Sequence, residues 1–233
     1  MICQFIVDNN FLESIAVGKN IYRARKCKFN NIPNNYMELG SPPSKSTKAN
    51  RYTKRGESAF YGAFDDVTPI CEILSDPSEF VTVALFRNTI PLNIINLYKF
   101  KEIDENKISL FDPDYFIKKF IIYFLIEICG KTAEEDELSY IPTQEMISFF
   151  RKEFKSKYSI DINGIVYPST ATNRNTANCV LFFDNSCFTD NIRDEDKPLK
   201  LILEETIHYP SNYWENTIRR KNKILFTFFE KNN

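Results

Sequence analysis

The chain has 233 residues, a formal net charge of −1 and an aromatic content of 15%, including 21 phenylalanines. This composition excludes an intrinsically disordered chain, and the balance of acids and bases argues against a protein that binds nucleic acids through a basic surface. The length fits one domain with a modest extension, large enough to bury a core without disulfide or metal staples.

Short apolar runs bounded by turn residues predict a series of strands. In chain order these runs cover residues 21–27, 58–64, 80–86, 92–97, 165–169, 179–184 and 199–209. Helices are predicted near residue 66, over 112–129 and from 142 to about 157. Residues 1–20 predict an edge strand or short helix, 30–57 a long polar loop and 213–231 a partly helical tail. Many short strands with a few helices between them favour an α+β fold.

Cysteine spacing and hydropathy indicate whether the chain binds a metal and where in the cell it is located. The six cysteines stand at positions 3, 27, 71, 129, 179 and 187, and His208 is the single histidine. No two cysteines have the Cys-x-x-Cys spacing of a zinc or redox site, so we expect no metal and six reduced, buried thiols. The first twenty residues are too polar for a signal peptide, and the longest apolar stretch, Phe120 to Cys129, is about half a membrane span. We expect a soluble, cytoplasmic protein with no membrane or nucleic-acid partner.

The helix near residue 66 carries a carboxylate in an unusual setting. We expect Asp65 or Asp66 to cap this helix, with Pro69 in its first turn and Glu72 one turn in. Glu72 has apolar neighbours on both sides. It either points outward from an amphipathic helix or sits in a pocket.

Two more polar residues stand out, although no motif of the usual kind is present. Arg51 ends the long polar loop, and Tyr61 lies in an otherwise apolar strand. There is no glycine-rich phosphate loop and no Gly-x-Ser-x-Gly elbow. A single histidine outside any recognisable setting argues against Ser-His-Asp and Cys-His mechanisms.

A set of segments resembles the RES domain family in order and spacing. They are Tyr22-Arg23-Ala24-Arg25, Leu39-Gly40-Ser41-Pro42-Pro43, Asn50-Arg51-Tyr52 with Gly56, Phe60-Tyr61-Gly62-Ala63-Phe64, Glu72, Tyr140-Ile141-Pro142-Thr143-Gln144, Asn163-Gly164-Ile165-Val166-Tyr167-Pro168-Ser169, and Asn178 with Val180–Asp184. The family is named for an Arg, a Glu and a Ser, which map to Arg51, Glu72 and Ser169. The resemblance covers about residues 21–188. It leaves 1–20 as an N-terminal segment and 189–233 as a C-terminal extension packed on the same domain.

The resemblance implies an ADP-ribosyltransferase-like fold, a pair of small twisted sheets with flanking helices and NAD+ in the cleft between them. It implies an NAD+-degrading enzyme that cleaves the nicotinamide–ribose bond as a glycohydrolase or phosphorylase, acting as a toxin or antiviral defence effector. One alternative is an ADP-ribosyltransferase that modifies a protein, and another is a catalytically dead interaction module. The nearest acids before Glu72 are Asp65 and Asp66, six or more residues upstream, which slightly favours small acceptors over protein acceptors.

The same resemblance implies roles for individual residues. The nicotinamide leaving group is already cationic, so one carboxylate suffices where ordinary glycoside hydrolysis needs two. The catalytic set implied is Glu72, Tyr61, Ser169 and Arg51. Glu72 contacts the ribose hydroxyls and the developing cation, and Tyr61 packs against the nicotinamide. Ser169 orients Glu72 or a ribose hydroxyl. Arg23 and Arg51 are expected to clamp the diphosphate, because a guanidinium matches phosphate oxygens bidentately. Further candidates for NAD+ binding are Arg25 and Asn178, whereas Gln144 is expected on the helix surface or behind the site.

Two segments depart from the family pattern. Residues 68–71 read Thr-Pro-Ile-Cys where relatives often carry a small residue and Ala, and residues 52–56 replace a Met-Ser-Pro-Ala-Gly loop. The second departure alters the loop expected to cover the substrate.

A toxin also needs restraint, so a cognate antitoxin or a sensing domain is an expected partner. The tail from about Asp190 is long enough for a homo-oligomer contact, with Trp214 as its anchor.

Overall fold

The computed structural model describes residues 1–28, 30–73, 80–102, 105–130, 137–173, 175–189 and 201–209. Its helices are α1 (Ile2–Asp8), α2 (Tyr36–Leu39), α3 (Thr68–Ile73), α4 (Tyr115–Cys129) and α5 (Ile141–Tyr158), with 3₁₀ turns at 44–46, 97–102, 105–107, 137–140 and 185–187. Its strands are β1 (Leu12–Ile15), β2 (Asn20–Cys27), β3 (Phe60–Ala63), β4 (Phe80–Asn88), β5 (Leu92–Asn96), β6 (Gly164–Pro168), β7 (Ala177–Leu181), β8 (Phe188–Thr189) and β9 (Leu201–Tyr209). The α+β class predicted from the sequence is confirmed.

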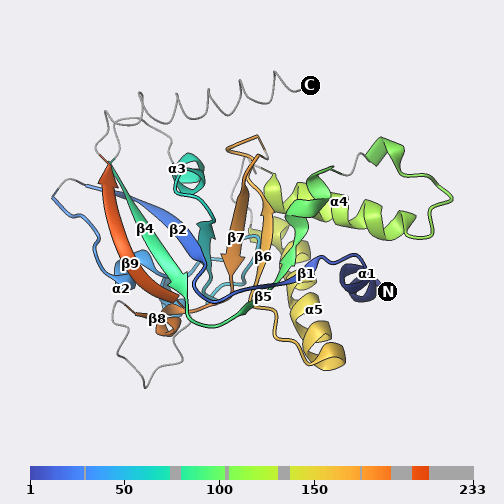
Figure 1. The fold of residues 1–233 in the computed structure, drawn as a ribbon, viewed down its shortest axis with the longest axis horizontal. Coiled ribbons are helices and arrows are strands. Elements are labelled where there is room, and N and C mark those ends of the chain that lie inside the picture. The colour runs from blue at the N-terminus through green and yellow to red at the C-terminus, as the bar shows by residue number, and fades with distance from the viewer. Residues whose placement is uncertain are drawn as a thin grey trace.

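The described strands form one sheet in the order β1-β5-β6-β7-β3-β2-β4-β9-β8. Figure 1 shows that this sheet has two halves, which turn away from each other between β3 and β2. The halves meet at a single register pair, Tyr22 with Ala63, whereas β2 pairs with β4 along its whole length. The resemblance implied a pair of small sheets; the described strands instead form one continuous sheet with two halves, because β2 pairs with β3 on one edge and with β4 on the other.

The consecutive strands β4 and β5 belong to different halves of the sheet. Asn88, at the end of β4, is buried and its amide donates to the backbone carbonyls of Ala16 at 2.9 Å and Ile90 at 2.8 Å. Its side-chain oxygen accepts from the backbone N–H of Lys19 at 2.7 Å. These bonds satisfy the backbone where the chain leaves one half and enters the other, since buried backbone groups need partners.

Two large apolar clusters form most of the core. In the first, α1, α4 and α5 cover β5, β6 and β7, with Phe124, Phe150 and Ile165 at its centre. α5 places its buried residues three or four positions apart, which is the spacing of one helix face. The second cluster takes residues from both halves, from β2, β3 and β4 as well as from β5, β6 and β7, and in it the ring centroids of Phe60 and Phe86 lie 5.0 Å apart. The site lies where β3, β7 and α3 meet β2.

Most of the predicted elements are present, with shifts of a few residues at their ends. The helices expected near residue 66, over 112–129 and from 142 are α3, α4 and α5. Residues 1–20 hold both a short helix and an edge strand. The predicted tail helix and Trp214 lie outside the described residues.

No disulfide joins any of the six cysteines, as expected, but two of them are not fully buried. Cys27 and Cys71 are half-exposed, because Cys27 ends β2 and Cys71 lies on the short, partly covered helix α3. Within the part of the chain described, no helix is both long and apolar enough to cross a membrane.

Candidate active site

The short helix α3 is held in place at its first turn by Asp65. One oxygen of this carboxylate accepts from the backbone N–H groups of Val67 at 3.0 Å and Thr68 at 2.8 Å, and the other accepts from the Thr68 hydroxyl at 2.7 Å. Such a cap satisfies N–H groups that a helix leaves unpaired. The Thr68 hydroxyl also lies 2.6 Å from that of Thr176, which ties the helix to the approach to β7. Glu72 is thereby positioned one turn into α3.

Two donors from neighbouring strands converge on the Glu72 carboxylate. Ser169 follows β6, and its hydroxyl donates to Glu72 Oε1 at 2.5 Å; Asn178 of β7 donates its amide N–H to the same oxygen at 2.6 Å. Ser169 is fully buried and Asn178 nearly so, whereas Glu72 is exposed. Hydrogen bonds to a charged acceptor are among the stronger ones in proteins. They orient the carboxylate, and neither of them uses Oε2.

Glu72 lines a cavity of about 340 Å³, a size typical of small-molecule sites. The other lining residues are Arg23, Ala24, Tyr61, Gly62, Pro69, Ile73, Tyr167 and Asn178. A Cβ on Gly62 would lie 2.8 Å from the Tyr22 carbonyl oxygen, so only glycine lets β3 approach β2 this closely. The cavity therefore lies at the junction of the two half-sheets.

Arg23 brings a positive charge to this cavity from β2. Its guanidinium lies 5.1 Å from the centroid of the Phe60 ring, and its buried Nη1 has no hydrogen-bond partner among the described residues. Burial, assisted by the neighbouring Arg25 charge, lowers the pKa of Arg23 to about 9, so it remains protonated at neutral pH. Leaving a buried donor unsatisfied costs about 1–3 kcal/mol, more for a charged group. A protonated guanidinium in this state favours binding of an anion.

Tyr61 is held at the cavity wall by contacts on both its ring and its hydroxyl. The hydroxyl donates to the side-chain oxygen of Asn50 at 2.5 Å, and the ring packs edge-on against Tyr52 at 5.7 Å. Burial raises the pKa of Tyr61 well above its usual range, so the phenol stays neutral. Tyr52 in turn lies 5.1 Å from Tyr167, which also lines the cavity. Tyr61 and Tyr167 thus give the cavity an aromatic wall, with Tyr52 packed against both.

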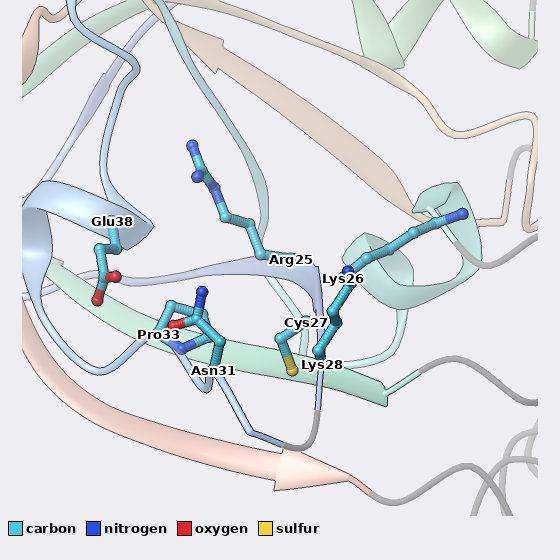
Figure 2. Close-up of a pocket in the computed structure, with 7 residues that line it drawn as sticks. All are labelled: Arg25, Lys26, Cys27, Lys28, Asn31, Pro33 and Glu38. Atoms are coloured by element: carbon cyan, nitrogen blue, oxygen red, sulfur yellow. The ribbon is translucent and has the colours of Figure 1, made fainter.

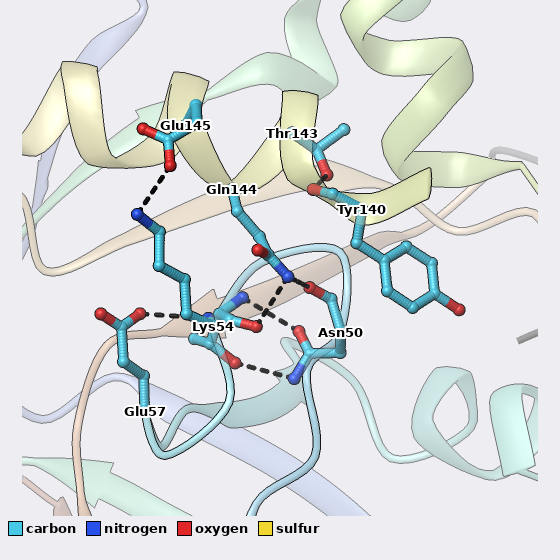
Figure 3. A network of polar contacts seen from close by, with 8 residues as sticks. Asn50, Lys54, Glu57, Tyr140, Thr143, Gln144 and Glu145 are labelled. Carbon is cyan, nitrogen blue, oxygen red and sulfur yellow. Dashed lines mark hydrogen bonds and ion pairs between the residues drawn. The ribbon is translucent and has the colours of Figure 1, made fainter. Parts of the chain in front are cut away.

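Gln144 is buried and lies behind the site, which is the second of the two places expected for it, rather than on the helix surface. Its side-chain N–H group donates to the backbone carbonyls of Asn50 at 2.7 Å and Thr53 at 3.1 Å, as Figure 3 shows. The Asn50 amide also donates to the Thr53 hydroxyl at 2.7 Å. Gln144 thus anchors the loop whose Asn50 holds Tyr61.

The structure brings Glu72, Ser169, Tyr61, Arg23 and Asn178 together, but it places two other candidates elsewhere. Arg51 is absent from the cavity lining; its Nη1 donates to the Ile128 carbonyl at 3.4 Å, and its guanidinium lies 6.0 Å from the Tyr140 ring. Arg25 lines a separate, neighbouring cavity.

Sequence reasoning missed the roles of Asn50 and Tyr167. Both stood inside the matched segments, but an asparagine before Arg51 and a tyrosine in a buried strand carried no signal of a contact with the site. No group of three His, Cys, Asp or Glu side chains in the described ranges could hold a metal ion.

The fold and the cavity define an α+β protein with a cavity of small-molecule size, whose wall carries one carboxylate held by two donors. The family model of the RES domain matches residues 20–202, and the chain belongs to this family. Membership associates it with NAD+-related enzymatic activity and a toxin-like role. None of the curated proteins matches the chain.

Proposed function

We propose that this chain cleaves NAD+ at its nicotinamide–ribose bond, with water or phosphate as the acceptor. The observation that carries the proposal is the Glu72 carboxylate, held by Ser169 and Asn178 at the wall of a cavity that Arg23 and Tyr61 also line. These groups supply the chemistry that the reaction needs: one fixed negative charge, one cation for phosphate and one aromatic face. We also infer that the two half-sheets correspond to an ADP-ribosyltransferase-like fold.

The reaction breaks the bond between ribose C1′ and the nicotinamide nitrogen. The bonding electron pair leaves with nicotinamide, which becomes neutral, so no general acid is needed. Positive charge develops on the ribose, and Glu72 stabilises it; a preorganised electrostatic partner contributes roughly 10²–10³ in rate. An oxygen of water or phosphate then bonds to C1′. Attacking water releases one proton to solvent, whereas phosphate dianion forms the new bond without losing one.

The remaining residues orient the substrate in this scheme. Tyr61, whose hydroxyl is fixed by Asn50, presents its ring to the nicotinamide. Arg23 binds the diphosphate and so gives its buried Nη1 a partner. Ser169 and Asn178 hold Glu72 through Oε1, which leaves Oε2 for a ribose hydroxyl. Arg51 supports the loop beside Tyr61, and a role in diphosphate binding would require it to move.

Depletion of NAD+ would arrest growth, so we propose that the chain acts as a toxin or antiviral defence effector in the cytoplasm. Such an effector requires restraint by a cognate antitoxin or a sensing domain. Self-association through the C-terminal residues is a separate proposal that a measurement of mass in solution would test; a monomer would contradict it.

The direct test is to incubate the purified protein with NAD+, with and without phosphate, and to separate the products by chromatography. Release of nicotinamide with ADP-ribose identifies hydrolysis, and a phosphorylated ADP-ribose formed only with phosphate identifies phosphorolysis. Transfer of ADP-ribose to a protein, without soluble ADP-ribose products, would replace this proposal with protein modification. No release of nicotinamide under any of these conditions would contradict it.

A further inference from the structure

The short helix α3 lies beside the start of β7 (Figure 1). It has 6 residues, far fewer than a helix needs to be stable by itself in water, so tertiary contacts must hold it. Glu72 accepts a hydrogen bond from the Asn178 amide at 2.6 Å. One turn earlier, the Thr68 hydroxyl lies 2.6 Å from that of Thr176. The position of the Glu72 carboxylate therefore depends on both contacts.

These two contacts are spaced alike on the helix and along the start of the strand. Thr68 and Glu72 are four residues apart, so they lie on one face of α3, about 6 Å apart along its axis. Thr176 and Asn178 are two residues apart, which in extended chain is about 6.4–6.8 Å. Because the two intervals nearly match, one placement of α3 satisfies both partners. The Asn178 bond alone would let α3 pivot about Glu72.

Thr176 holds Ser169 as well as α3. Its backbone carbonyl accepts from the Ser169 N–H at 2.9 Å, which extends the ladder between β6 and β7 beyond its last pair, Pro168 with Ala177. The Ser169 hydroxyl in turn donates to Glu72. One residue thus fixes a donor to the carboxylate through its carbonyl, and the helix that carries the carboxylate through its hydroxyl.

The Thr176 hydroxyl lies in the middle of a chain of polar side chains. The Thr68 hydroxyl, at one end, also donates to the Asp65 carboxylate at 2.7 Å. On the other side, the Thr172 hydroxyl lies 2.6 Å from that of Thr176 and 3.3 Å from the Ser169 carbonyl oxygen. Thr68 and Thr172 are buried, where a polar group left without a partner is costly. Removal of the central hydroxyl would therefore disconnect the cap of α3 from the loop after β6.

We propose that Thr176 is a positioning residue for the cleavage reaction: it fixes α3 against β7, and so Glu72 against Ser169, without contacting the substrate. This inference rests on the proposed function. Thr176 is not among the described residues that line the Glu72 cavity. The separate cavity in Figure 2 is bordered by the end of β2, the segment after it and α2, and none of its described lining residues belongs to α3 or β7. Loss of the Thr176 hydroxyl should misplace Glu72 and leave both cavity linings otherwise unchanged.

A pair of substitutions at Thr176 separates positioning from packing. Thr176→Val keeps the shape of the side chain and removes the hydroxyl, whereas Thr176→Ser keeps the hydroxyl. Thr176→Val should lower kcat for NAD+ by about tenfold or more and leave KM nearly unchanged, because it misplaces a catalytic group but removes no contact with the substrate. Thr176→Ser should restore most of the wild-type kcat. An unchanged kcat in Thr176→Val, a rise in KM instead, or equal losses in both variants would overturn the proposal.

The same hydrogen bond can be broken from its other side, which provides a second test. Thr68→Val should reproduce the kinetic loss of Thr176→Val, and the double variant should lose little more, because the two residues act through one bond. Thr82→Val is the matched control for a buried threonine. Thr82 lies on β4, and its hydroxyl is 3.4 Å from the Cys27 sulfur, so kcat should stay at the wild-type value even if the melting temperature falls. Additive losses in the double variant, or a loss of kcat in Thr82→Val as large as that in Thr176→Val, would contradict the proposal.

Hydrogen exchange measures the hold on α3 without any turnover. The backbone N–H groups of α3 and of Ser169 should exchange faster in Thr176→Val than in the wild type and Thr176→Ser, while those of β5 keep their wild-type rates. Unchanged exchange in α3 would overturn the proposal. The kinetic measurement on the wild type separates the two failures. If the wild type releases no nicotinamide, the proposed function fails; if it does and Thr176→Val matches it, only the role of Thr176 fails.

Discussion

At the scale of single residues, the site depends on how one carboxylate oxygen is held. Ser169 and Asn178 both donate to Glu72 Oε1, at 2.5 and 2.6 Å, and both are buried beneath an exposed glutamate. Buried donors on two adjacent strands define the position of the carboxylate more tightly than its own short helix could. Two variants can therefore separate the effect of the Glu72 charge from the effect of one of the hydrogen bonds that hold it.

Glu72→Gln should abolish turnover while keeping the fold. The glutamine carbonyl oxygen can still accept both hydrogen bonds, but the negative charge that we propose stabilises the ribosyl cation is lost. We expect NAD+ cleavage to fall by at least roughly 10²–10³ and the melting temperature to change little, since Glu72 is exposed. Nicotinamide release and thermal unfolding measure the two effects. Near wild-type turnover in a folded variant would rule out this role for Glu72.

Ser169→Ala should weaken activity without abolishing it, because Asn178 still holds Glu72 Oε1. A hydrogen bond to a charged group is worth about 1.5–3 kcal/mol, so we expect a fall in kcat of about tenfold or more. Ser41→Ala is the matched stability control. Ser41 is equally buried, but its hydroxyl has no partner among the described residues, and its removal should leave the melting temperature unchanged or higher. Unaltered kcat in Ser169→Ala would show that the Ser169 bond is only structural.

At the scale of elements, α5 positions the loop that in turn holds the Tyr61 side chain. Gln144 on α5 reaches the carbonyls of Asn50 and Thr53, and the Asn50 side chain accepts from the Tyr61 hydroxyl. The loop has little regular structure of its own, so these bonds help to determine where it lies. A helix outside the cavity thereby positions a residue that lines it.

Gln144→Leu should destabilise the protein and loosen the Tyr61 wall. It removes the donor to the part-buried Asn50 carbonyl and one of the two donors to the Thr53 carbonyl, for which we expect a cost of about 1–3 kcal/mol. Denaturant unfolding measures this loss. Glu145→Gln, on the next residue, breaks only the exposed ion pair with Lys54 and should change the free energy of unfolding by less than about 1 kcal/mol. Similar effects of both variants would contradict the role of Gln144.

At the scale of the whole molecule, β6 is the strand on which the packing of its half depends. It pairs in parallel with β5 and antiparallel with β7, and all of its residues are buried. Gly164 opens this strand where it passes the backbone of β7. A Cβ at this position would lie 2.3 Å from the Val180 carbonyl oxygen and 2.7 Å from a Leu181 methyl group.

Gly164→Ala should therefore prevent normal folding. Neither a carbonyl oxygen nor a paired strand can move aside within a close-packed sheet, so we expect destabilisation above about 3 kcal/mol and loss of soluble expression. Gly56→Ala is the matched control: Gly56 has a φ of +84°, but nothing lies within 4 Å of an added Cβ. Its cost should be limited to about 1–2 kcal/mol of backbone strain. A Gly164→Ala protein with a near wild-type melting temperature would contradict the packing described here.

Much of the fold follows from local patterns. The helix after Asp65, the apolar helix from Asp112 and the strand before Ser169 were predictable, because caps, periodicity and turn residues act over a few positions. Glu72 and Ser169 were also predictable as candidates from their segments. The link between them was not, since a hydrogen bond between residues 97 positions apart depends on which strands become neighbours.

By itself, the sequence determined the α+β class, the order of elements and the membership of the RES domain family, since these depend on short-range patterns and on matched segments. Only the tertiary structure decided which arginines reach the cavity. Arg23, Arg25 and Arg51 look alike as solvated cations in a sequence, but Arg23 lines the Glu72 cavity, Arg25 lines a separate cavity and Arg51 donates to a carbonyl of α4. Their differences come from strand pairing and loop anchoring over long range, which residue identity does not encode.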